Sequence, residues 1–330
     1  MKFTYALLLT IVLTLNLQKV NAQHEKPNII YIMVDDLGYE DVGCYGSKYN
    51  LTPNIDALAK GGLLLTDYHS NGATCSPTRA ALMTGQYQNR FGERFEGPLS
   101  ATSKDSIDDG LPNEVYTLAE ALKDNGYATG MYGKWHLGAK PPLMPANQGF
   151  DDFVGLGYGD GDHFTHIDRL GNEDWWHNDI LKKEDGYSVD LITDHSVDFI
   201  KNNRDMPFFL YVSHLAIHFP WQAPDDPPQR ELGKDYRSDK WGIIPDRDNV
   251  RPHVKGMIEA VDTGVGKIMA TLKELDLEKN TLVIFTSDNG GYIEYKSGGF
   301  KNISSNGSLR GQKGTVYEGG HRVPFIAYWP

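Results

Sequence analysis

The chain contains only two cysteines, Cys44 and Cys75, among its 330 residues. A small scaffold stapled by disulfides is therefore excluded, because such folds depend on a high density of cysteine. Basic residues are also scarce: 32 Lys and Arg stand against 44 Asp and Glu, for a net charge of −12. This balance argues against a nucleic-acid-binding protein, which neutralises phosphates with a basic surface. Any anionic ligand would have to meet a local concentration of positive charge.

The longest mostly apolar run lies within the first residues of the chain. A mostly apolar stretch over residues 5–17 is followed by small or apolar residues at the −3 and −1 positions of a cleavage site after Ala22. This pattern predicts a secretory signal peptide over residues 1–22. The alternative, a membrane anchor, needs about 18 or more uninterrupted apolar residues, and Thr10 and Asn16 break the run. We expect export to the periplasm or the exterior, with no stable membrane insertion after cleavage.

Strand-like and helix-like segments alternate along the remaining chain, without repeats, low-complexity tracts or an interdomain linker. The predicted strands cover residues 28–34, 128–132, 207–213, 281–287 and 323–329. The predicted helices cover residues 53–60, 76–84, 117–125, 187–202 and 254–275. Such alternation predicts an α/β domain with a mainly parallel sheet flanked by helices. The last predicted strand ends one residue before the end of the chain, with no later segment to cover it.

Two acidic or amide pairs directly follow predicted strands. Asp35-Asp36 follows the first strand and Asp288-Asn289 follows the strand over residues 281–287. In open α/β sheets, ligands bind at the carboxyl ends of the strands. Carboxylate and amide oxygens, without thiolate or imidazole, suit Ca²⁺ or Mg²⁺ better than zinc. One such pair also fits a helix cap or a turn, but two pairs at equivalent strand ends favour a metal site.

Cys75 stands at the start of a predicted helix, in the run Cys75-Ser76-Pro77-Thr78-Arg79. Proline is favoured in a first helical turn, so Cys75 would lie at a helix N-terminus, where the dipole and free N–H groups attract anions. Arg79, one turn further along, would reach the same place. Cys75 is therefore a candidate low-pKa thiol beside an anion site. A Cys44–Cys75 disulfide is the alternative for an exported protein.

The run from Cys75 to Arg79, with Thr84-Gly85 closing the same helix, resembles the signature of the type I, formylglycine-dependent sulfatases. These enzymes include the arylsulfatases and share the fold of the alkaline-phosphatase superfamily. In that family a maturase oxidises the cysteine to Cα-formylglycine, whose hydrate is the nucleophile. The resemblance implies that Cys75 is neither a thiol nor half of a disulfide in the mature protein. Cys44 would then be an ordinary free cysteine.

Other segments resemble the family in the same order, over essentially all of residues 26–330. They include Gly133-Lys134-Trp135-His136-Leu137-Gly138, His218-Phe219-Pro220 and Gly311-Gln312-Lys313-Gly314. By resemblance the metal ligands are Asp35, Asp36, Cys75, Asp288 and Asn289, and the catalytic or sulfate-binding residues are Arg79, Lys134, His136, His218 and Lys313. Family members continue into a smaller C-terminal subdomain. The resemblance therefore implies a catalytic domain over residues 23–330 that is incomplete at its C-terminus.

Two of the matched positions have competitors nearby. His214 precedes His218 but alternates with strand residues, as a core or supporting histidine would. Lys296 and Arg310 lie near Lys313 in a glycine-rich stretch. The motif positions favour His218 and Lys313.

The resemblance implies hydrolysis of a sulfate ester. Arg79, Lys134, Lys313 and a cation, Ca²⁺ or Mg²⁺, would stabilise the charge that builds up on the sulfate. His218, together with Lys313, would protonate the leaving oxygen. His136 would deprotonate the remaining hydroxyl of the nucleophile, so that the aldehyde re-forms and sulfate departs. A cysteine or serine would be left as a stable sulfate ester at that step.

The segment between Gly138 and Tyr187 is rich in glycine and aromatic residues, which is typical of a loop over an active site. Trp175 and Trp176 are candidates to stack on a sugar ring, and packing of the loop onto the core is the alternative. Asp162, His163 and His166 offer a weaker second metal site. Export, an acidic body and this loop favour a sulfated carbohydrate as substrate over a steroid or lipid sulfate.

Two other functions remain open from the sequence. A phosphatase or phosphodiesterase of the same superfamily would use serine or threonine as nucleophile and usually two zinc ions, which the residues around Cys75 disfavour. A non-catalytic binder of sulfated glycans would result if Cys75 stays unmodified.

Overall fold

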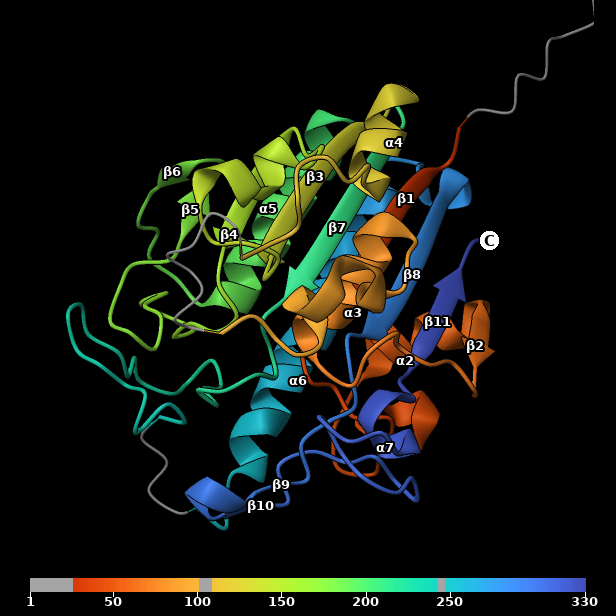
Figure 1. The fold of residues 1–330 in the computed structure, drawn as a ribbon. Helices are drawn as coiled ribbons and strands as arrows, with labels where there is room; N and C mark the ends of the chain where they lie inside the picture. The colour runs from red at the N-terminus through yellow and green to blue at the C-terminus, as the bar shows by residue number, and fades with distance from the viewer. Residues whose placement is uncertain (1–25, 101–108, 243–246) are drawn as a thin grey trace, which may run out of the picture.

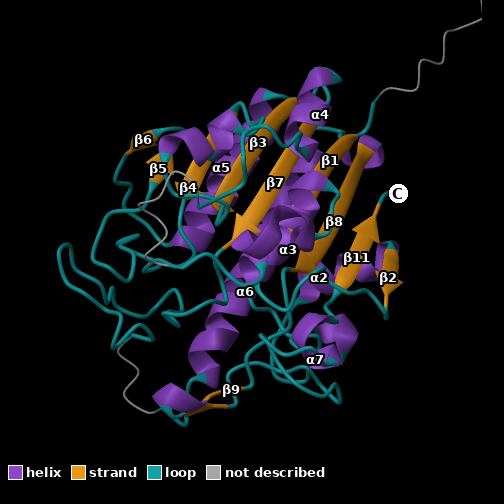
Figure 2. Ribbon diagram, viewed as in Figure 1, coloured by secondary structure: helices purple, strands orange, loops and turns teal. Residues whose placement is uncertain are grey.

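A nine-stranded sheet crosses the centre of the molecule, with helices on both faces (Figures 1 and 2). The computed structural model describes residues 26–100, 109–242 and 247–330, so the predicted signal peptide lies outside the described residues. The strands in spatial order are β2 (Leu63–Leu65), β11 (Phe325–Tyr328), β8 (Thr281–Ser287), β1 (Asn28–Val34), β7 (Phe208–His214), β3 (Ala128–Lys134), β4 (Asp152–Leu156), β5 (Trp176–His177) and β6 (Ile180–Leu181). Among the described helices, none is long and apolar enough to cross a bilayer.

The five central strands, from β8 to β4, all run parallel, and the edge strands pair antiparallel. The predicted α/β fold with a mainly parallel sheet is confirmed. The strands β2, β4, β5 and β6 were not predicted. Three of them have only two or three residues, too few for a hydrophobic pattern, and β4 contains Gly155.

The predicted helices are all present, with bounds within three residues of those expected. They are α2 (Pro53–Gly61), α3 (Cys75–Thr84), α4 (Leu118–Asp124), α5 (Ser188–Asn202) and α6 (Arg251–Glu274). A capping box begins α4: Thr117 Oγ1 accepts from the Glu120 N–H, and the Glu120 carboxylate accepts from the Thr117 N–H. The short helix α7 (Glu318–His321) and the hairpin of β9 (Glu294–Tyr295) and β10 (Phe300–Lys301) follow β8.

Alternate residues of the central strands enter two separate cores. Ile30, Ile32 and Val34 of β1 pack with residues of α5 and α6 on one face, and Tyr31 and Met33 pack with residues of α3 and α4 on the other. Figure 2 shows these two helix pairs on opposite sides of the sheet. Because both faces are covered, the strands appear in the sequence as continuous apolar runs.

The carboxyl ends of β1, β3, β7 and β8 meet at one edge of the sheet, and α3 begins there. Gly133 near the end of β3 lies very close to β7: its φ is +111°, and a Cβ would stand 1.9 Å from the carbonyl oxygen of Ser213. Only glycine fits that conformation and that space. The strand end that carries Lys134 therefore depends on glycine at position 133.

Replacing Gly133 with alanine should destabilise the fold more than the same change at Gly126. Gly126 also has a positive φ, of +79°, but nothing lies within 4 Å of its added Cβ. We expect Gly126→Ala to lower the free energy of unfolding by about 1 kcal/mol, from backbone strain alone. Gly133→Ala should cost about 1–3 kcal/mol more, because β7 must move. Chemical denaturation measures both, and equal losses would contradict the close packing.

Candidate active site

Three carboxylates and one amide converge at the carboxyl edge of the sheet. Asp35 and Asp36 follow β1, and Asp288 and Asn289 follow β8; all four side chains are buried. Because β1 and β8 are parallel neighbours with Val34 opposite Ser287, the two pairs lie side by side. One carboxylate oxygen from each of the three aspartates lies within 4.8 Å of the other two. The structure thus brings together the two pairs that were predicted to form a metal site.

These residues fit a divalent cation. The Asn289 amide nitrogen donates to Asp36 Oδ1 at 2.8 Å, while its Oδ1 is buried and has no hydrogen-bond partner among the described residues. A buried, unpaired oxygen is costly. Burial, with the nearby charge of Asp35, raises the pKa of Asp288. A cation would relieve both effects, and an all-oxygen donor set suits Ca²⁺ or Mg²⁺.

Two buried lysines reach into this cluster from different segments. Lys134, the last residue of β3, donates to Asp35 Oδ2. Lys313 donates to Asp36 Oδ1, and its Nζ lies 3.1 Å from Cys75 Sγ. Burial opposes the charge of Lys313, but Asp36 outweighs it and the pKa of Lys313 rises well above its ordinary value. Lys313 therefore remains protonated beside Cys75.

Arg79 joins the helix that begins at Cys75 to the strands of the site. It is buried, and both Nε and Nη2 donate to Asp288 Oδ2, at 3.1 and 2.8 Å. Its Nη1 donates to the Lys134 carbonyl oxygen at 3.0 Å and to Ser213 Oγ on β7. One guanidinium group thus connects α3 with β3, β7 and the segment after β8.

Cys75 is the first residue of α3 and is buried. Its Sγ lies 3.4 Å from Asp35 Oδ1. Burial and the negative charge of Asp35 raise the pKa of the Cys75 thiol to about 12. The prediction of a low-pKa thiol from the helix N-terminus alone is therefore wrong, because desolvation and a neighbouring carboxylate outweigh the helix dipole. Cys44 and Cys75 are both free, so the alternative of a disulfide is also wrong.

His136 holds a neutral ring with one nitrogen available. Its Nε2 lies 3.1 Å from the Leu99 carbonyl oxygen, which can only accept, so Nε2 carries the proton and Nδ1 the lone pair. That Nδ1 has no partner among the described residues. Burial and the charge of Lys134 lower the pKa of His136 well below its ordinary value. His136 is therefore neutral, with the Nδ1 lone pair available as an acceptor.

His218 lies beside the carboxylate cluster, with one ring nitrogen within 4.8 Å of Cys75 Sγ and of a carboxylate oxygen of Asp35. Its Nε2 is 4.0 Å from Asp36 Oδ2, and its Nδ1 donates to the Phe219 carbonyl oxygen at 2.8 Å. Burial, Lys313 and Lys134 lower the pKa of His218 well below its ordinary value. An anion bound between His218 and the lysines would oppose that shift, because a negative charge favours the protonated ring.

The backbone at the site is also unusual. Asp36 and His136 adopt positive φ angles of 66° and 56°. Residues other than glycine rarely adopt this left-handed conformation, and strain of this kind collects at functional sites.

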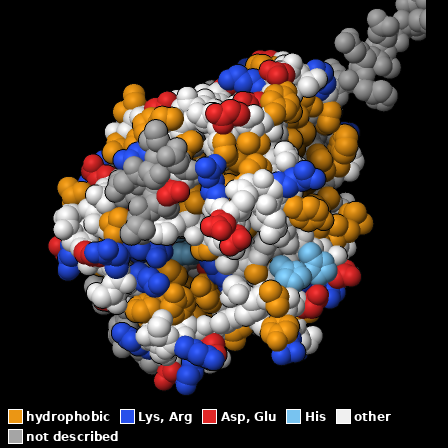
Figure 3. Space-filling view, viewed as in Figure 1, with side chains coloured by type: hydrophobic (Ala, Val, Ile, Leu, Met, Phe, Trp, Pro, Cys, Tyr) orange, Lys and Arg blue, Asp and Glu red, His pale blue; other side chains and the backbone are white. Residues whose placement is uncertain are grey.

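A cavity of about 420 Å³ opens above these groups. Cys75, His136, His218 and Lys313 line it, while Asp35, Asp36, Arg79, Lys134, Asp288 and Asn289 do not line it and are buried. The remaining walls include three cationic residues that were not predicted: Arg169, Arg237 and Lys240. No sequence pattern marked them, because they come from irregular segments. Figure 3 shows Lys and Arg side chains beside a hollow on this face of the molecule.

The two tryptophans predicted to bind sugar do not line this cavity. Trp175 is only 2% exposed, stacks on His166 at a ring distance of 4.1 Å, and donates from Nε1 to Glu184. Trp176 belongs to β5 and donates from Nε1 to Asp174. Trp175 is therefore too buried to stack on a sugar ring. Trp176 is half-buried on β5, which pairs with β4, and it packs against the core outside this cavity.

Asp162, His163 and His166 do not form the weaker metal site either. Both carboxylate oxygens of Asp162 accept N–H groups, from the 164–165 and 229–230 backbone and from Gln222. His163 bonds Ser188 Oγ at 2.7 Å. Asp162 instead organises the loop.

His214, the competitor of His218, ends β7 in the interior, where burial lowers its pKa to about 3.

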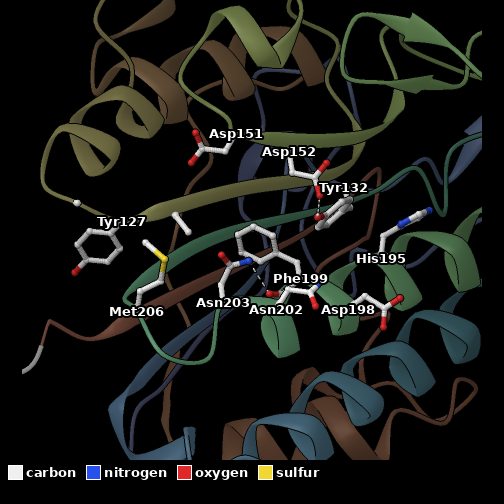
Figure 4. A pocket seen from close by; sticks show the side chains of 12 residues that line it. Tyr127, Tyr132, Asp151, Asp152, His195, Asp198, Phe199, Asn202, Asn203 and Met206 are labelled. Carbon is white, nitrogen blue, oxygen red and sulfur yellow. Dashed lines mark hydrogen bonds between the residues drawn. The ribbon is translucent and has the colours of Figure 1, made fainter.

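A larger cavity, of about 720 Å³, lies at the opposite end of the strands (Figure 4). It lies beside Ala128 and Asp152, where β3 and β4 begin. Asp151, Asp152 and Asp198 line it, and within the described part of the chain its lining includes no Lys or Arg. Its charge is therefore unsuited to an anion, and the smaller cavity over Cys75 is the better candidate active site.

Comparisons with known proteins point to one family. The family model described as Sulfatase matches residues 27–330. Human arylsulfatase A is 35% identical over 92% of this chain and 59% of its own length, and rat N-acetylgalactosamine-6-sulfatase is 35% identical over 98% of this chain and 60% of its own. A crystal structure of Ps i-CgsB in complex with k-i-k-neocarrahexaose is 35% identical, with a TM-score of 0.76, over 93% of this chain and 66% of that one. The chain spans about 60% of the length of these two curated relatives.

Adding Ca²⁺ to the chelator-treated protein should raise its melting temperature. A cation that binds only the folded state at a hundred times its Kd stabilises by about 2.7 kcal/mol. Asn289→Leu removes the unpaired amide oxygen and should shrink this shift by more than half, whereas Asn125→Leu, at the exposed end of α4, should leave it unchanged. Differential scanning fluorimetry with Ca²⁺ and Mg²⁺ measures the effect. No stabilisation by either ion would contradict the site.

Proposed function

The chain belongs to the sulfatase family, and from this premise we propose that it hydrolyses sulfate monoesters at the cavity over Cys75. The observation that carries the proposal is the arrangement around position 75. A side chain at a helix N-terminus lies against a buried carboxylate cluster that fits a cation, with Lys313 at 3.1 Å and His136 and His218 lining the same cavity.

The properties of Cys75 support its conversion to formylglycine. A thiol whose pKa is about 12 is protonated at neutral pH and is a poor nucleophile. When present, the cation would stabilise negative charge, and the hydrated formylglycine would supply the oxygen that attacks sulfur. A formylglycine-generating maturase is therefore a required partner in the proposal.

The chain's own residues would then bind the sulfate and move protons. Lys313 places a charged ammonium group beside position 75, and the ammonium group of Lys134 donates to Asp35 in the same cluster. Both would stabilise the non-bridging oxygens as negative charge develops on them. Arg79 on α3 donates to Asp288 and so fixes the position of this helix relative to Asp288. This contact would keep a constant geometry between the nucleophile and the cation ligands.

The two histidines take opposite parts in proton transfer. The Nδ1 of His136 carries a lone pair and would accept the proton of the nucleophile's remaining hydroxyl, which lets sulfate depart. His218, which lines the same cavity, would donate a proton to the leaving oxygen once the bound ester offsets the charges that lower its pKa. Lys313, protonated and near both groups, would assist this donation.

We further propose a sulfated carbohydrate as the substrate, and export as the location. The related Ps i-CgsB was crystallised with k-i-k-neocarrahexaose, and another relative is an N-acetylgalactosamine-6-sulfatase. The cavity walls combine cationic residues with Tyr158, Phe219, Tyr292 and Tyr295, which suits an anionic ligand with ring faces to contact. The predicted signal peptide supports export.

Mass spectrometry of the peptide that contains residues 75–79 should reveal formylglycine in protein made together with the maturase. The same protein should hydrolyse sulfate esters, and Cys75→Ala should lose that activity to the limit of detection, because no attacking oxygen remains. An unmodified thiol in protein from the maturase-containing host, or activity that survives in Cys75→Ala, would overturn the sulfatase mechanism. An unmodified thiol together with tight binding of a sulfated glycan would favour a non-catalytic binder.

His218→Ala should affect substrates according to their leaving groups. General acid catalysis contributes about 10²–10⁴-fold, so kcat on a sugar sulfate should fall by that factor. Loss on an activated aryl sulfate, whose phenol departs without a proton, should stay below about tenfold. His69→Ala, an exposed histidine outside the cavity, is the matched control. Equal losses on both substrates would contradict the role of His218.

A further inference from the structure

Positive charge is concentrated in the cavity beyond what one sulfate requires. Four of its lining residues are Lys or Arg, and none of its described lining residues is Asp or Glu, in a chain whose net charge is −12. Lys313 belongs to the site of the scissile sulfate. Arg169 and Lys240 lie instead on the wall formed around Phe219. Among the described residues, no hydrogen bond or ion pair joins either of these two cations to Cys75 or Lys313.

Arg169 carries a charge that its carboxylate partner does not fully balance. Its Nε donates to Asp160 Oδ1 at 3.0 Å, and the other oxygen of Asp160 accepts from Arg230 Nη2, also at 3.0 Å. One buried carboxylate therefore faces two guanidinium groups. The Arg169 side chain is 19% exposed and lines the cavity, while that of Arg230 is only 2% exposed. The surplus charge thus lies on the cavity side.

Lys240 is held by aromatic rings. Its Nζ lies 5.2–5.6 Å from the centroids of Phe219, Trp241 and Tyr295, and no carboxylate of the described residues forms an ion pair with it. Cation–π contacts fix the ammonium group without cancelling its charge. Arg237 differs, because Asp235 binds it at 2.6 Å and its side chain is 60% exposed, so it adds less to the cavity.

These two cations lie one aromatic ring away from the proposed proton donor. The ring of Phe219 is 4.1 Å from that of His218, and both the Arg169 guanidinium carbon and Lys240 Nζ lie 5.5 Å from the centroid of Phe219. The leaving group of the ester would lie beside His218. A second anionic group on the same sugar or the adjoining one would therefore come within reach of Arg169 and Lys240.

We propose that Arg169 and Lys240 form a second anion subsite, and that the substrate is a glycan bearing another sulfate or a carboxylate next to the scissile sulfate. This inference rests on the proposed sulfatase function. A charged hydrogen bond at such a subsite makes the enzyme select multiply charged glycans over singly sulfated ones.

The test compares two oligosaccharides that share the scissile sulfate, one carrying no other charge and one carrying a second sulfate. A third, with a uronate carboxylate in place of the second sulfate, distinguishes the two kinds of anion. Lys240→Gln should lower kcat/KM on the doubly charged substrates about ten- to a hundredfold, as expected for loss of a charged hydrogen bond. Its effect on the singly sulfated substrate should be at least tenfold smaller. Lys234→Gln removes an exposed lysine of the same loop outside the cavity, and should change neither value.

Equal losses on all three substrates, or none on any, would overturn the subsite while leaving the sulfatase function intact. If the wild-type protein hydrolyses none of them, the proposed function fails, and calorimetry then decides the subsite separately. In that measurement the disulfated oligosaccharide should bind wild type and Lys234→Gln alike, and Lys240→Gln about tenfold or more weakly. Unchanged binding by Lys240→Gln would refute the subsite.

Discussion

Three carboxylates buried at one edge of the sheet set the main constraint on this structure. An unpaired charge in the interior costs several kcal/mol, and Asp35, Asp36 and Asp288 lie within a few ångströms of one another. Each is paired with one buried cation: Lys134 with Asp35, Lys313 with Asp36, and Arg79 with Asp288. These cations come from three distant segments of the chain. The site that would bind sulfate therefore also holds the fold together at this edge.

This pairing also explains how the site would respond to a divalent cation. Lys134 and Lys313 are paired with carboxylates, and in the proposed function a bound sulfate ester would need the same two ammonium groups. A cation held by Asp35, Asp36, Asp288 and Asn289 would take over part of the negative charge, so that the lysines become available to the substrate. The unpaired oxygen of Asn289 and the left-handed backbone of Asp36 belong to the same arrangement. Each of these two features lowers the stability of the folded protein, and a functional role of the site would explain why both are present.

The acidic body of the protein and its cationic cavity are compatible because the charges are separated in space. Buried salt bridges neutralise the aspartates beneath the cavity, while the charged side chains among its described lining residues are all Lys or Arg. The low dielectric of the interior makes a few cations there more effective than many on the surface. An overall charge of −12 therefore argues against a broad polyanion-binding surface, such as nucleic acid requires, but not against a pocket for a sulfate group.

The sequence by itself determined the parts of the structure that depend on local patterns. Apolar runs, caps and helix-stopping glycines predicted five helices and four of the five central strands, all but β4. Motifs that resemble those of a known family indicated the residues at positions 35, 36, 75, 79, 134, 136, 218, 288, 289 and 313. Tertiary structure alone decided the environment of those residues. It raised the pKa of Cys75 by burial beside Asp35, where the helix N-terminus had predicted a lower one. It placed Trp175 in the core and brought Arg169 and Lys240 to the cavity. Burial, desolvation and contacts between irregular segments depend on how distant parts of the chain pack, and no local pattern encodes them.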